Sequence, residues 1–164
     1  MLLLCMANYR RIFEDGYSYF ITMVTYRRQP LLVDHIDLLR KSFMLSRQRY
    51  DYVIDAIVVL PDHIHMIITP KNALDYPKII SHIKRSFVYG LDDNVKINAQ
   101  MTLGYSSYMR RLSGIWQKRF YEHTIRNEKD MLEKMDYIRY NATKHNLVDR
   151  WDQWRYSSFV KSNK

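Results

Sequence analysis

The sequence predicts an α+β fold in which helices pack on one antiparallel sheet. Two apolar runs, 52–60 and 63–69, are separated by only two residues, which favours a tight antiparallel hairpin. Segments with helical periodicity alternate with β-branched and aromatic segments in the order β-α-β-β-α-β-α. In the α+β class, some strands are joined directly by hairpins, and the helices pack together on the antiparallel sheet. The predicted order of elements fits this class.

Length and composition predict one soluble globular domain spanning residues 1–164. The chain is 47% apolar and 26% charged, it contains no linker or repeat, and no apolar run is long enough to span a membrane. The single cysteine, Cys5, excludes a disulfide framework and a cysteine-rich zinc site, and it indicates a reducing, cytoplasmic compartment. Residues 1–8 are expected to be disordered or to follow a misassigned start, with Met6 as the alternative first residue.

The first strand is expected at 17–26, where aromatic and β-branched residues dominate. A helix should begin after a cap at Asp34 and run to about Tyr50. The inward face of this helix comprises Ile36, Leu39, Phe43 and Leu45.

The run 52–60 is continuous enough to be a buried central strand, and Pro61-Asp62 forms the turn into the strand 63–69. A second helix is expected from about Asp75 to Tyr89. Its inward face comprises Ile79, Ile80, Ile83 and Phe87.

Residues 90–114 are interpreted as a loop that contains a short helix around 105–112. A fourth strand is expected at 116–125 and a long final helix from Glu128 to about Asn146. This order describes a ferredoxin-like (RRM-like) fold, with helices on one face of the sheet and the functional site on the other, open face.

The net charge of +9 and the pI of about 9.6 indicate a polyanionic partner, above all nucleic acid. The 14 tyrosines can supply stacking faces for unpaired bases, or they can pack in the core.

The segment His63-Ile64-His65 is the clearest chemical signal in the sequence. Side chains alternate along a strand, so the two imidazoles project from the same face, about 7 Å apart along the chain. Such a pair can bind one divalent ion. The alternative is two ordinary strand histidines that form hydrogen bonds at the sheet surface.

The final helix can supply the remaining groups of a site. Its apolar stripe comprises Met131, Met135, Ile138 and Ala142, and the opposite side comprises Tyr137, Tyr140, Asn141 and Lys144. Tyr137 and Asn141 are four residues apart, so one helix can present a phenol and a carboxamide to the same point. The alternative is a solvated face with two exposed tyrosines.

These features resemble a known family. The His-hydrophobe-His segment is similar to the signature of the HUH single-strand nucleases. The segments 116–126, 136–141 and 144–148, in this order, resemble the REP-associated tyrosine transposases, the single-copy relatives of the IS200-like single-tyrosine transposases. The resemblance spans about residues 9–159. The chain departs from the family pattern at Ala142, where relatives usually have Pro, and at Asn146, where they often have Gly.

The resemblance implies that His63 and His65 bind Mg²⁺ or Mn²⁺, with Asn141 as a further metal ligand. It also implies that Tyr137 attacks the scissile phosphate and forms a 5′-phosphotyrosine and a free 3′-OH. Tyr140 is a second candidate for the nucleophile. Tyr137 is preferred because the family motif places its tyrosine four residues before the asparagine.

The expected partner is single-stranded or hairpin DNA in a bacterial cytoplasm, in association with the nucleoid, and the chain should act as a monomer or a homodimer. The segment Asn8-Tyr9-Arg10-Arg11 resembles one that reads a short sequence at the foot of a hairpin. His123 is expected to have a structural role, and Trp151 and Trp154 should pack the last segment of the chain. The candidate DNA-binding residues are Arg10, Arg11, Arg27, Arg28, Lys84, Arg85, Arg110, Arg111, Lys118, Arg119 and Arg126.

The expected function is therefore a metal-dependent, single-strand DNA endonuclease and strand transferase that acts on REP-like hairpins. The first alternative is an inactive, domesticated protein that binds hairpin DNA. The others are a replication initiator or relaxase, which usually has a longer chain, and a non-enzymatic RNA-binding domain.

Overall fold

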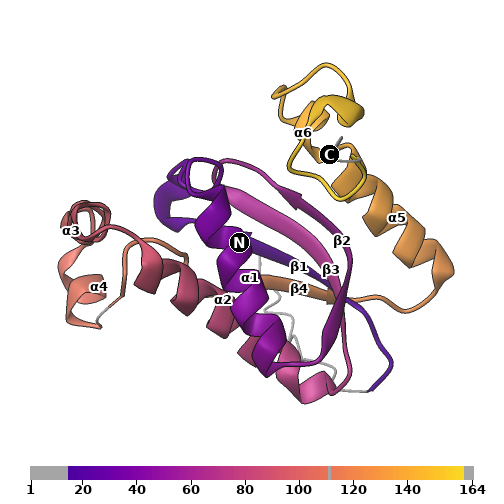
Figure 1. Cartoon of the computed structure of the whole chain (residues 1–164), viewed down its shortest axis with the longest axis horizontal. Coiled ribbons are helices and arrows are strands. Elements are labelled where there is room, and N and C mark those ends of the chain that lie inside the picture. The colour runs from indigo at the N-terminus through magenta and orange to yellow at the C-terminus, as the bar shows by residue number, and fades with distance from the viewer. Residues whose placement is uncertain (1–14, 111, 161–164) are drawn as a thin grey trace, which may run out of the picture.

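A computed structural model describes residues 15–110 and 112–160, in which four antiparallel strands form one sheet in the order β2-β3-β1-β4 (Figure 1). The strands are β1 (Tyr19–Val24), β2 (Tyr52–Val59), β3 (His63–Pro70) and β4 (Tyr121–Thr124). The predicted α+β class with an antiparallel sheet is thus confirmed. The expectations for residues 1–8, and for Arg10, Arg11 and Arg111, lie outside the described residues.

The hairpin predicted between the second and third strands is present. β2 pairs with β3, and the amide of Leu60 donates to the carbonyl of His63 across the turn, which leaves Pro61 and Asp62 as the two loop residues. β3 also pairs with β1, where Thr22 lies opposite His65. β3 is therefore an interior strand of the sheet.

Helices α1 (Ile36–Arg49) and α2 (Tyr76–Gly90) cover one face of the sheet. The larger apolar core lies between them and the strands and includes Ile64, Met66, Ile80 and Phe87.

Two predicted details of α1 are wrong. The helix begins at Ile36 after His35, so Asp34 does not cap it, and Leu45 is 37% exposed rather than inward. Ser42 and Ser46 occupy the buried positions beside Leu39 instead. Ser42 satisfies its hydroxyl by donating to the Leu38 carbonyl, which lets a polar residue take an inward position.

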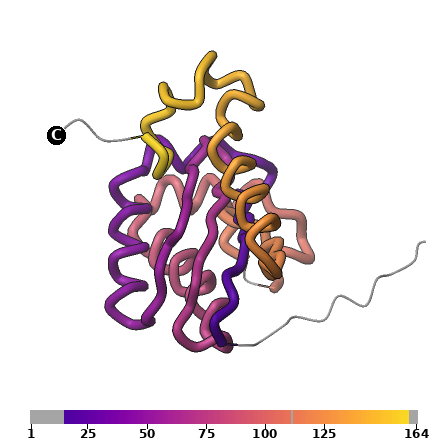
Figure 2. Tube along the Cα trace, turned by 90° about the vertical axis from the view of Figure 1, so that its right-hand side faces the viewer, coloured from indigo at the N-terminus to yellow at the C-terminus, as the bar shows by residue number. Residues whose placement is uncertain are grey.

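The other face of the sheet is not open, in contrast to the prediction. Helix α5 (Glu128–Arg139) crosses this face (Figure 2), and a second, smaller apolar cluster lies beneath it. Ile138 from α5 packs there with Phe20, Val58 and Ile67 from the strands. The sequence explains why α5 packs on this face. The helix carries a stripe of apolar side chains, and these are removed from water when they pack against the sheet.

The predicted final helix is divided in two. Tyr140 adopts φ −91° and ψ 4°, and its amide donates to the carbonyls of both Asp136 and Ile138, so α5 ends there and the short α6 (Asn141–Lys144) follows. Asn146 has φ 55°, in the left-handed region that favours Gly or Asn after a helix. The predicted position of the helix end is therefore correct, and the continuity of the helix is wrong.

The stretch 90–114 contains more structure than predicted. The predicted short helix is present as α4 (Tyr105–Met109), but Asp93–Met101 also forms a helix, α3, which the prediction treated as loop. Ala99 is the only residue of α3 that is buried, so this helix has almost no apolar stripe for a sequence pattern to detect.

The fourth strand is shorter than the predicted 116–125. Trp116 forms one isolated bridge with Thr25, and regular pairing with β1 begins only at Tyr121. Between these two points the chain leaves the sheet at the exposed residues Gln117, Lys118 and Arg119.

The last described segment closes the outer edge of β2. The amide of Val59 donates to the Tyr156 carbonyl over 2.9 Å, and the amide of Ser158 donates to the Ile57 carbonyl over 2.8 Å. Trp154 Nε1 donates to the Val59 carbonyl over 2.9 Å, and the Trp151 ring contacts Tyr140. Both tryptophans thus pack this segment, as predicted. Within the described residues, no helix has the length and apolar composition needed to cross a bilayer.

Candidate active site

His63 and His65 lie on the face of the sheet that α5 covers. Their neighbours Ile64 and Met66 point into the larger core on the opposite face, as strand alternation requires. The two imidazoles are 4% and 5% exposed as residues, and their ring centres are 4.8 Å apart. The pair is therefore buried beneath a helix rather than displayed on an open surface.

Each imidazole is held through Nδ1. His63 Nδ1 lies 2.5 Å from an Asp62 carboxylate oxygen, and His65 Nδ1 lies 2.8 Å from Thr22 Oγ1. No described residue forms a hydrogen bond with Nε2 of either ring. A histidine that is oriented through one nitrogen while the other is free has the arrangement typical of metal ligands.

Burial lowers the pKa of His65 to about 3, and the positive charges of His63, His145 and Lys144 act in the same direction. His65 is therefore a neutral imidazole at pH 7, with a lone pair available at one nitrogen. Asp62 also has a lowered pKa: burial acts to raise it, but the hydrogen bonds and charges of His63 and Arg28 outweigh that effect.

Tyr137 lies beside the histidine pair. Its ring centre is 5.0 Å from that of His65 and 5.7 Å from that of Phe20, and the residue is 39% exposed. Lys144 Nζ lies 5.0 Å from the centre of the Tyr137 ring. The phenol thus has solvent access and a cation next to it.

Tyr140 has different neighbours. Its ring contacts Trp151 at 6.5 Å, on the segment that follows α6. The fold therefore brings Tyr137, rather than Tyr140, into contact with the imidazoles.

Asn141 is fully buried, and neither its side-chain oxygen nor its nitrogen has a hydrogen-bond partner among the described residues. It lies one helical turn after Tyr137 and one turn before His145, whose ring centre is 5.0 Å from that of His63. The segment that carries Asn141 therefore passes directly over both imidazoles. A buried amide without partners is costly unless it serves another purpose, such as binding an ion.

The donor set fits a small divalent cation. Two imidazoles whose Nε2 atoms have no hydrogen-bond partner among the described residues, together with one amide oxygen, suit an ion that also retains water and phosphate oxygens. Within residues 15–110 and 112–160, no group of three His, Cys, Asp or Glu side chains is arranged to hold a metal. The amide oxygen of Asn141 is a donor of the kind that small divalent cations also accept.

His123 forms a structural pair rather than part of the imidazole cluster, as predicted. Its Nε2 lies 2.8 Å and 3.0 Å from the two carboxylate oxygens of Asp130 on α5. Asp130 also accepts from the amide of Arg126, and its own amide donates to the Asn127 side chain that caps α5. These hydrogen bonds connect the end of β4 to the start of α5, the helix that carries Tyr137.

The basic residues selected from the sequence are distributed over both faces. Arg28 pairs with Asp62 over 3.1 Å, directly beside His63, and Arg27 is exposed next to it. Lys84 lies on α2, where it donates to the Gln117 carbonyl over 2.9 Å, and burial lowers its pKa to about 8. The remaining described members are exposed, and they lie within α2, after α4 and on either side of β4: Arg85, Arg110, Lys118, Arg119 and Arg126.

Three residues that surround the site were not predicted from the sequence: Asp62 and Thr22 orient the imidazoles, and His145 approaches them from the end of α6. Lys144, which was predicted on the same side of the final helix as Tyr137, lies over the Tyr137 ring. The spacing Tyr137, Asn141, His145 is i, i+4, i+8, and it could have indicated His145. The role of Thr22 depends on strand register, which the sequence does not specify.

Comparisons with known proteins identify the family of this chain. Residues 14–141 match the family model "Transposase IS200 like". The chain is 38% identical to a Haemophilus influenzae protein assigned to the REP-associated tyrosine transposases, over 97% of this chain and 89% of that protein. It is 33% identical to the REP-associated tyrosine transposase of Escherichia coli K12, over 94% of this chain and 83% of that protein.

A solved structure of a REP-associated tyrosine transposase bound to a REP hairpin superposes with a TM-score of 0.74 at 32% identity, and the match covers 94% of this chain and 83% of that one. The match at family level spans most of the chain and includes both histidines, Tyr137 and Asn141. The chain therefore belongs to the IS200-like transposases and, among them, to the REP-associated tyrosine transposases.

Proposed function

We propose that this protein is a metal-dependent endonuclease and strand transferase that cleaves and rejoins single-stranded DNA at REP-like hairpins. The observation that carries the proposal is the contact of Tyr137 with His65, next to a second imidazole and under a helix whose asparagine amide has no partner among the described residues. A nucleophile beside candidate metal ligands is the inventory that phosphoryl transfer to tyrosine requires.

In the proposed reaction, Tyr137 Oη attacks phosphorus in line. The new Oη–P bond forms as the P–O3′ bond breaks, which gives a 5′-phosphotyrosine and a 3′-hydroxyl. The phenol loses its proton to solvent, and the departing 3′ oxygen takes one up. A 3′-hydroxyl from another strand can reverse the step, because the energy of the broken ester is retained in the phosphotyrosine.

Charge around Tyr137 supports this role. Lys144 lies over one side of the phenol ring, and Lys134 Nζ lies 5.3 Å from the centre of the neighbouring Phe20 ring. Both cations favour the approach of a phosphate and the negative charge that develops on its oxygens.

His63 and His65, through Nε2, and Asn141, through its amide oxygen, are the residues that would hold Mg²⁺ or Mn²⁺. The bound ion would supply charge neutralisation at the scissile phosphate. Asp62 and Thr22 fix the imidazole orientations without any contribution from the ion.

The proposed DNA partner follows from the relative whose solved structure contains a REP hairpin, and from the net charge of +9. Arg28 and Arg27, beside the imidazoles, are the first candidates for phosphate contact, and the other basic residues selected above remain candidates. Tyr137 contacts a histidine of its own chain, which supports action as a monomer.

The test is incubation of the protein with labelled REP-type hairpin DNA and Mn²⁺, followed by a denaturing gel. Wild-type protein should give a covalent adduct, and the Tyr137→Phe variant should give none, whereas Tyr140→Phe should retain it. An adduct that still forms with the Tyr137→Phe variant would show that Tyr137 is not the nucleophile. Tight hairpin binding without any adduct would favour a non-catalytic DNA-binding protein.

A further inference from the structure

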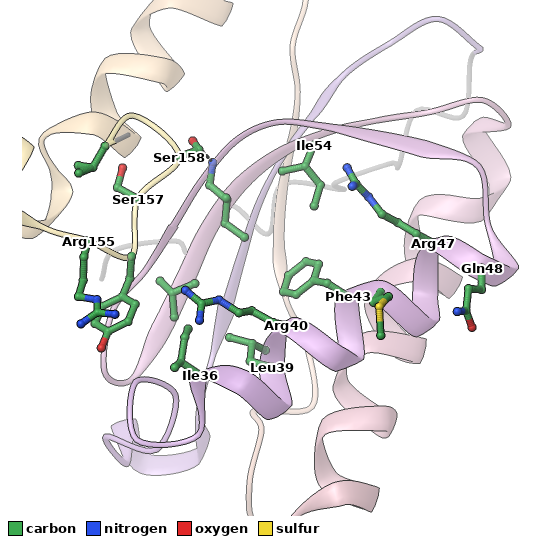
Figure 3. A pocket seen from close by; sticks show the side chains of 15 residues that line it. Ile36, Leu39, Arg40, Phe43, Arg47, Gln48, Ile54, Arg155, Ser157 and Ser158 are labelled. Carbon is green, nitrogen blue, oxygen red and sulfur yellow. Dashed lines mark hydrogen bonds between the residues drawn. The ribbon is translucent and has the colours of Figure 1, made fainter. Parts of the chain in front are cut away.

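A groove of about 710 Å³ lies on the opposite side of the molecule from the imidazoles. α1 forms one wall, β2 forms the floor, and the segment 155–160 forms the other wall (Figure 3). No residue of the candidate active site lines it.

The charge of this groove has one sign. Arg40, Arg47 and Arg155 line it, and none of its lining residues is acidic. Arg40 is paired with Asp37 on the same helix, but Arg47 and Arg155 have no carboxylate partner within the described part of the chain. Two guanidinium groups are therefore available to an anionic ligand.

The floor of the groove is apolar and partly aromatic. Phe43 projects from α1 toward Ile54 on β2 (Figure 3), and Ile57 and Tyr156 also line the groove. The Arg155 guanidinium lies 5.4 Å from the centre of the Tyr156 ring. A ligand that carries a flat, apolar ring and a negatively charged group would match these aromatic, apolar and arginine side chains. Unpaired nucleotides have that chemistry, since the bases stack on aromatic rings while the phosphates bind arginine.

We propose that this groove binds the unpaired DNA that flanks the hairpin, as a second nucleic-acid site separate from the cleavage site. The proposal rests on the proposed function for the identity of the polymer. The two sites lie on opposite faces of β2: Val58 points into the cluster beneath α5, and the next residue, Val59, lines the groove. A strand that passes from one face to the other at the outer edge of β2 has to cross the segment 155–160, which closes that edge and carries Arg155.

The experiment uses the Tyr137→Phe protein, so that binding is measured without cleavage. Fluorescence anisotropy compares a labelled blunt hairpin with the same hairpin carrying roughly eight unpaired thymidines, a length that such surfaces bind. Arg47→Ala combined with Arg155→Ala should weaken binding of the tailed hairpin about tenfold and leave binding of the blunt hairpin unchanged. The slope of log K against log salt should decrease by about 1.4 for the tailed DNA, since two single-strand phosphate contacts are lost.

The matched control is Lys41→Ala combined with Lys71→Ala, which removes the same charge from exposed positions outside the groove. It should affect both DNAs equally and slightly. An equal loss for blunt and tailed hairpins in the arginine variant, or no loss at all, would overturn the proposal.

A second measurement locates the strand directly. Hairpins whose unpaired tails contain 5-iodouracil are irradiated in complex with the protein, and the crosslinked peptides are identified by mass spectrometry. Crosslinks at Phe43, Met44 or Tyr156 are expected, and crosslinks confined to the His63 face would contradict the proposal. Neither measurement requires catalysis, so the groove and the proposed reaction can fail independently.

Discussion

At the scale of single residues, the orientation of the imidazoles is the feature most open to test. His65 depends on one hydroxyl, Thr22 Oγ1, for its Nδ1 contact. Thr22→Val keeps the shape and removes the hydroxyl, so the ring loses its fixed orientation. We expect the Mn²⁺ concentration for half-maximal adduct formation to rise about 10- to 100-fold, the usual cost of losing such a partner.

The control for this change is Thr22→Ser, which retains a hydroxyl and should remain close to wild type in the same Mn²⁺ titration. If the Thr22→Val and Thr22→Ser variants need the same Mn²⁺ concentration for half-maximal adduct formation, the hydroxyl does not orient His65.

The side chain of Asn141 should lower the stability of the metal-free protein, although the proposed cleavage reaction requires it. Its amide is fully buried and has no partner among the described residues, so metal-free protein bears its desolvation cost. Asn141→Leu removes that cost at similar volume and should raise the melting temperature of metal-free protein by about 2–4 °C, equivalent to about 1 kcal/mol. The same variant should form no adduct.

Melting of both proteins with and without Mn²⁺ provides the check. Mn²⁺ should raise the melting temperature of wild-type protein and leave that of the leucine variant unchanged. A leucine variant that is less stable than wild type without metal would mean that the amide already has a favourable environment.

At the scale of elements, the connection between β4 and α5 predicts a pH dependence. Burial acts to raise the pKa of Asp130, but its hydrogen bonds from His123 and the Arg126 amide, together with nearby positive charge, lower it on balance. A carboxylate with a lowered pKa stabilises the fold above its ordinary pKa of 3.8, and the contribution is lost as pH falls through the lowered value.

Asp130→Asn should therefore reduce the free energy of unfolding by about 1–2 kcal/mol at pH 7. Urea denaturation at a series of pH values should show the variant and wild type converging in acid. A difference that stays constant down to the lowest pH would contradict the role of the charge.

Gly114 controls how α3 packs on the chain that leads to β4. Its φ is +72°, and a Cβ placed there would clash with the Ala99 carbonyl group of α3. Gly114→Ala combines an unfavourable backbone conformation with this backbone clash and should cost about 2–4 kcal/mol. Gly104→Ala is the matched control, because nothing lies within 4 Å of the position that its Cβ would take, and it should cost under about 1 kcal/mol by urea denaturation.

The elements also explain which parts of the structure a sequence can predict. The hairpin of β2 and β3 was predictable because its apolar runs and its turn act locally. α3 was not, since it buries only Ala99, and the break at Tyr140 was not, since the pattern continues across it. In the site, strand alternation correctly places the two histidines on one face, whereas the contacts of Thr22 and His145 arise only from the pairing of distant segments.

At the scale of the whole molecule, the sheet separates two unequal apolar layers. The larger one contains α1 and α2, and the smaller one contains α5. α2 contributes five buried side chains to its layer, whereas α5 contributes Ile138 alone, supported by the partly buried Met131 and Met135. The described basic residues that the sequence suggests for DNA binding lie on both sides of this division, Arg28 near the imidazoles and Lys84 on α2.

The unequal layers imply that the molecule does not loosen uniformly. Local opening requires less free energy where fewer apolar contacts are lost, so amides of α5 should exchange with deuterium sooner than those of α2. Mass spectrometry of peptides from the two helices gives the order directly, and equal protection would contradict it. Because Tyr137 is part of α5, the phenol would move away from the imidazoles whenever this helix opens, and the fraction of molecules with an assembled reaction centre is then set by an equilibrium that arriving DNA can shift.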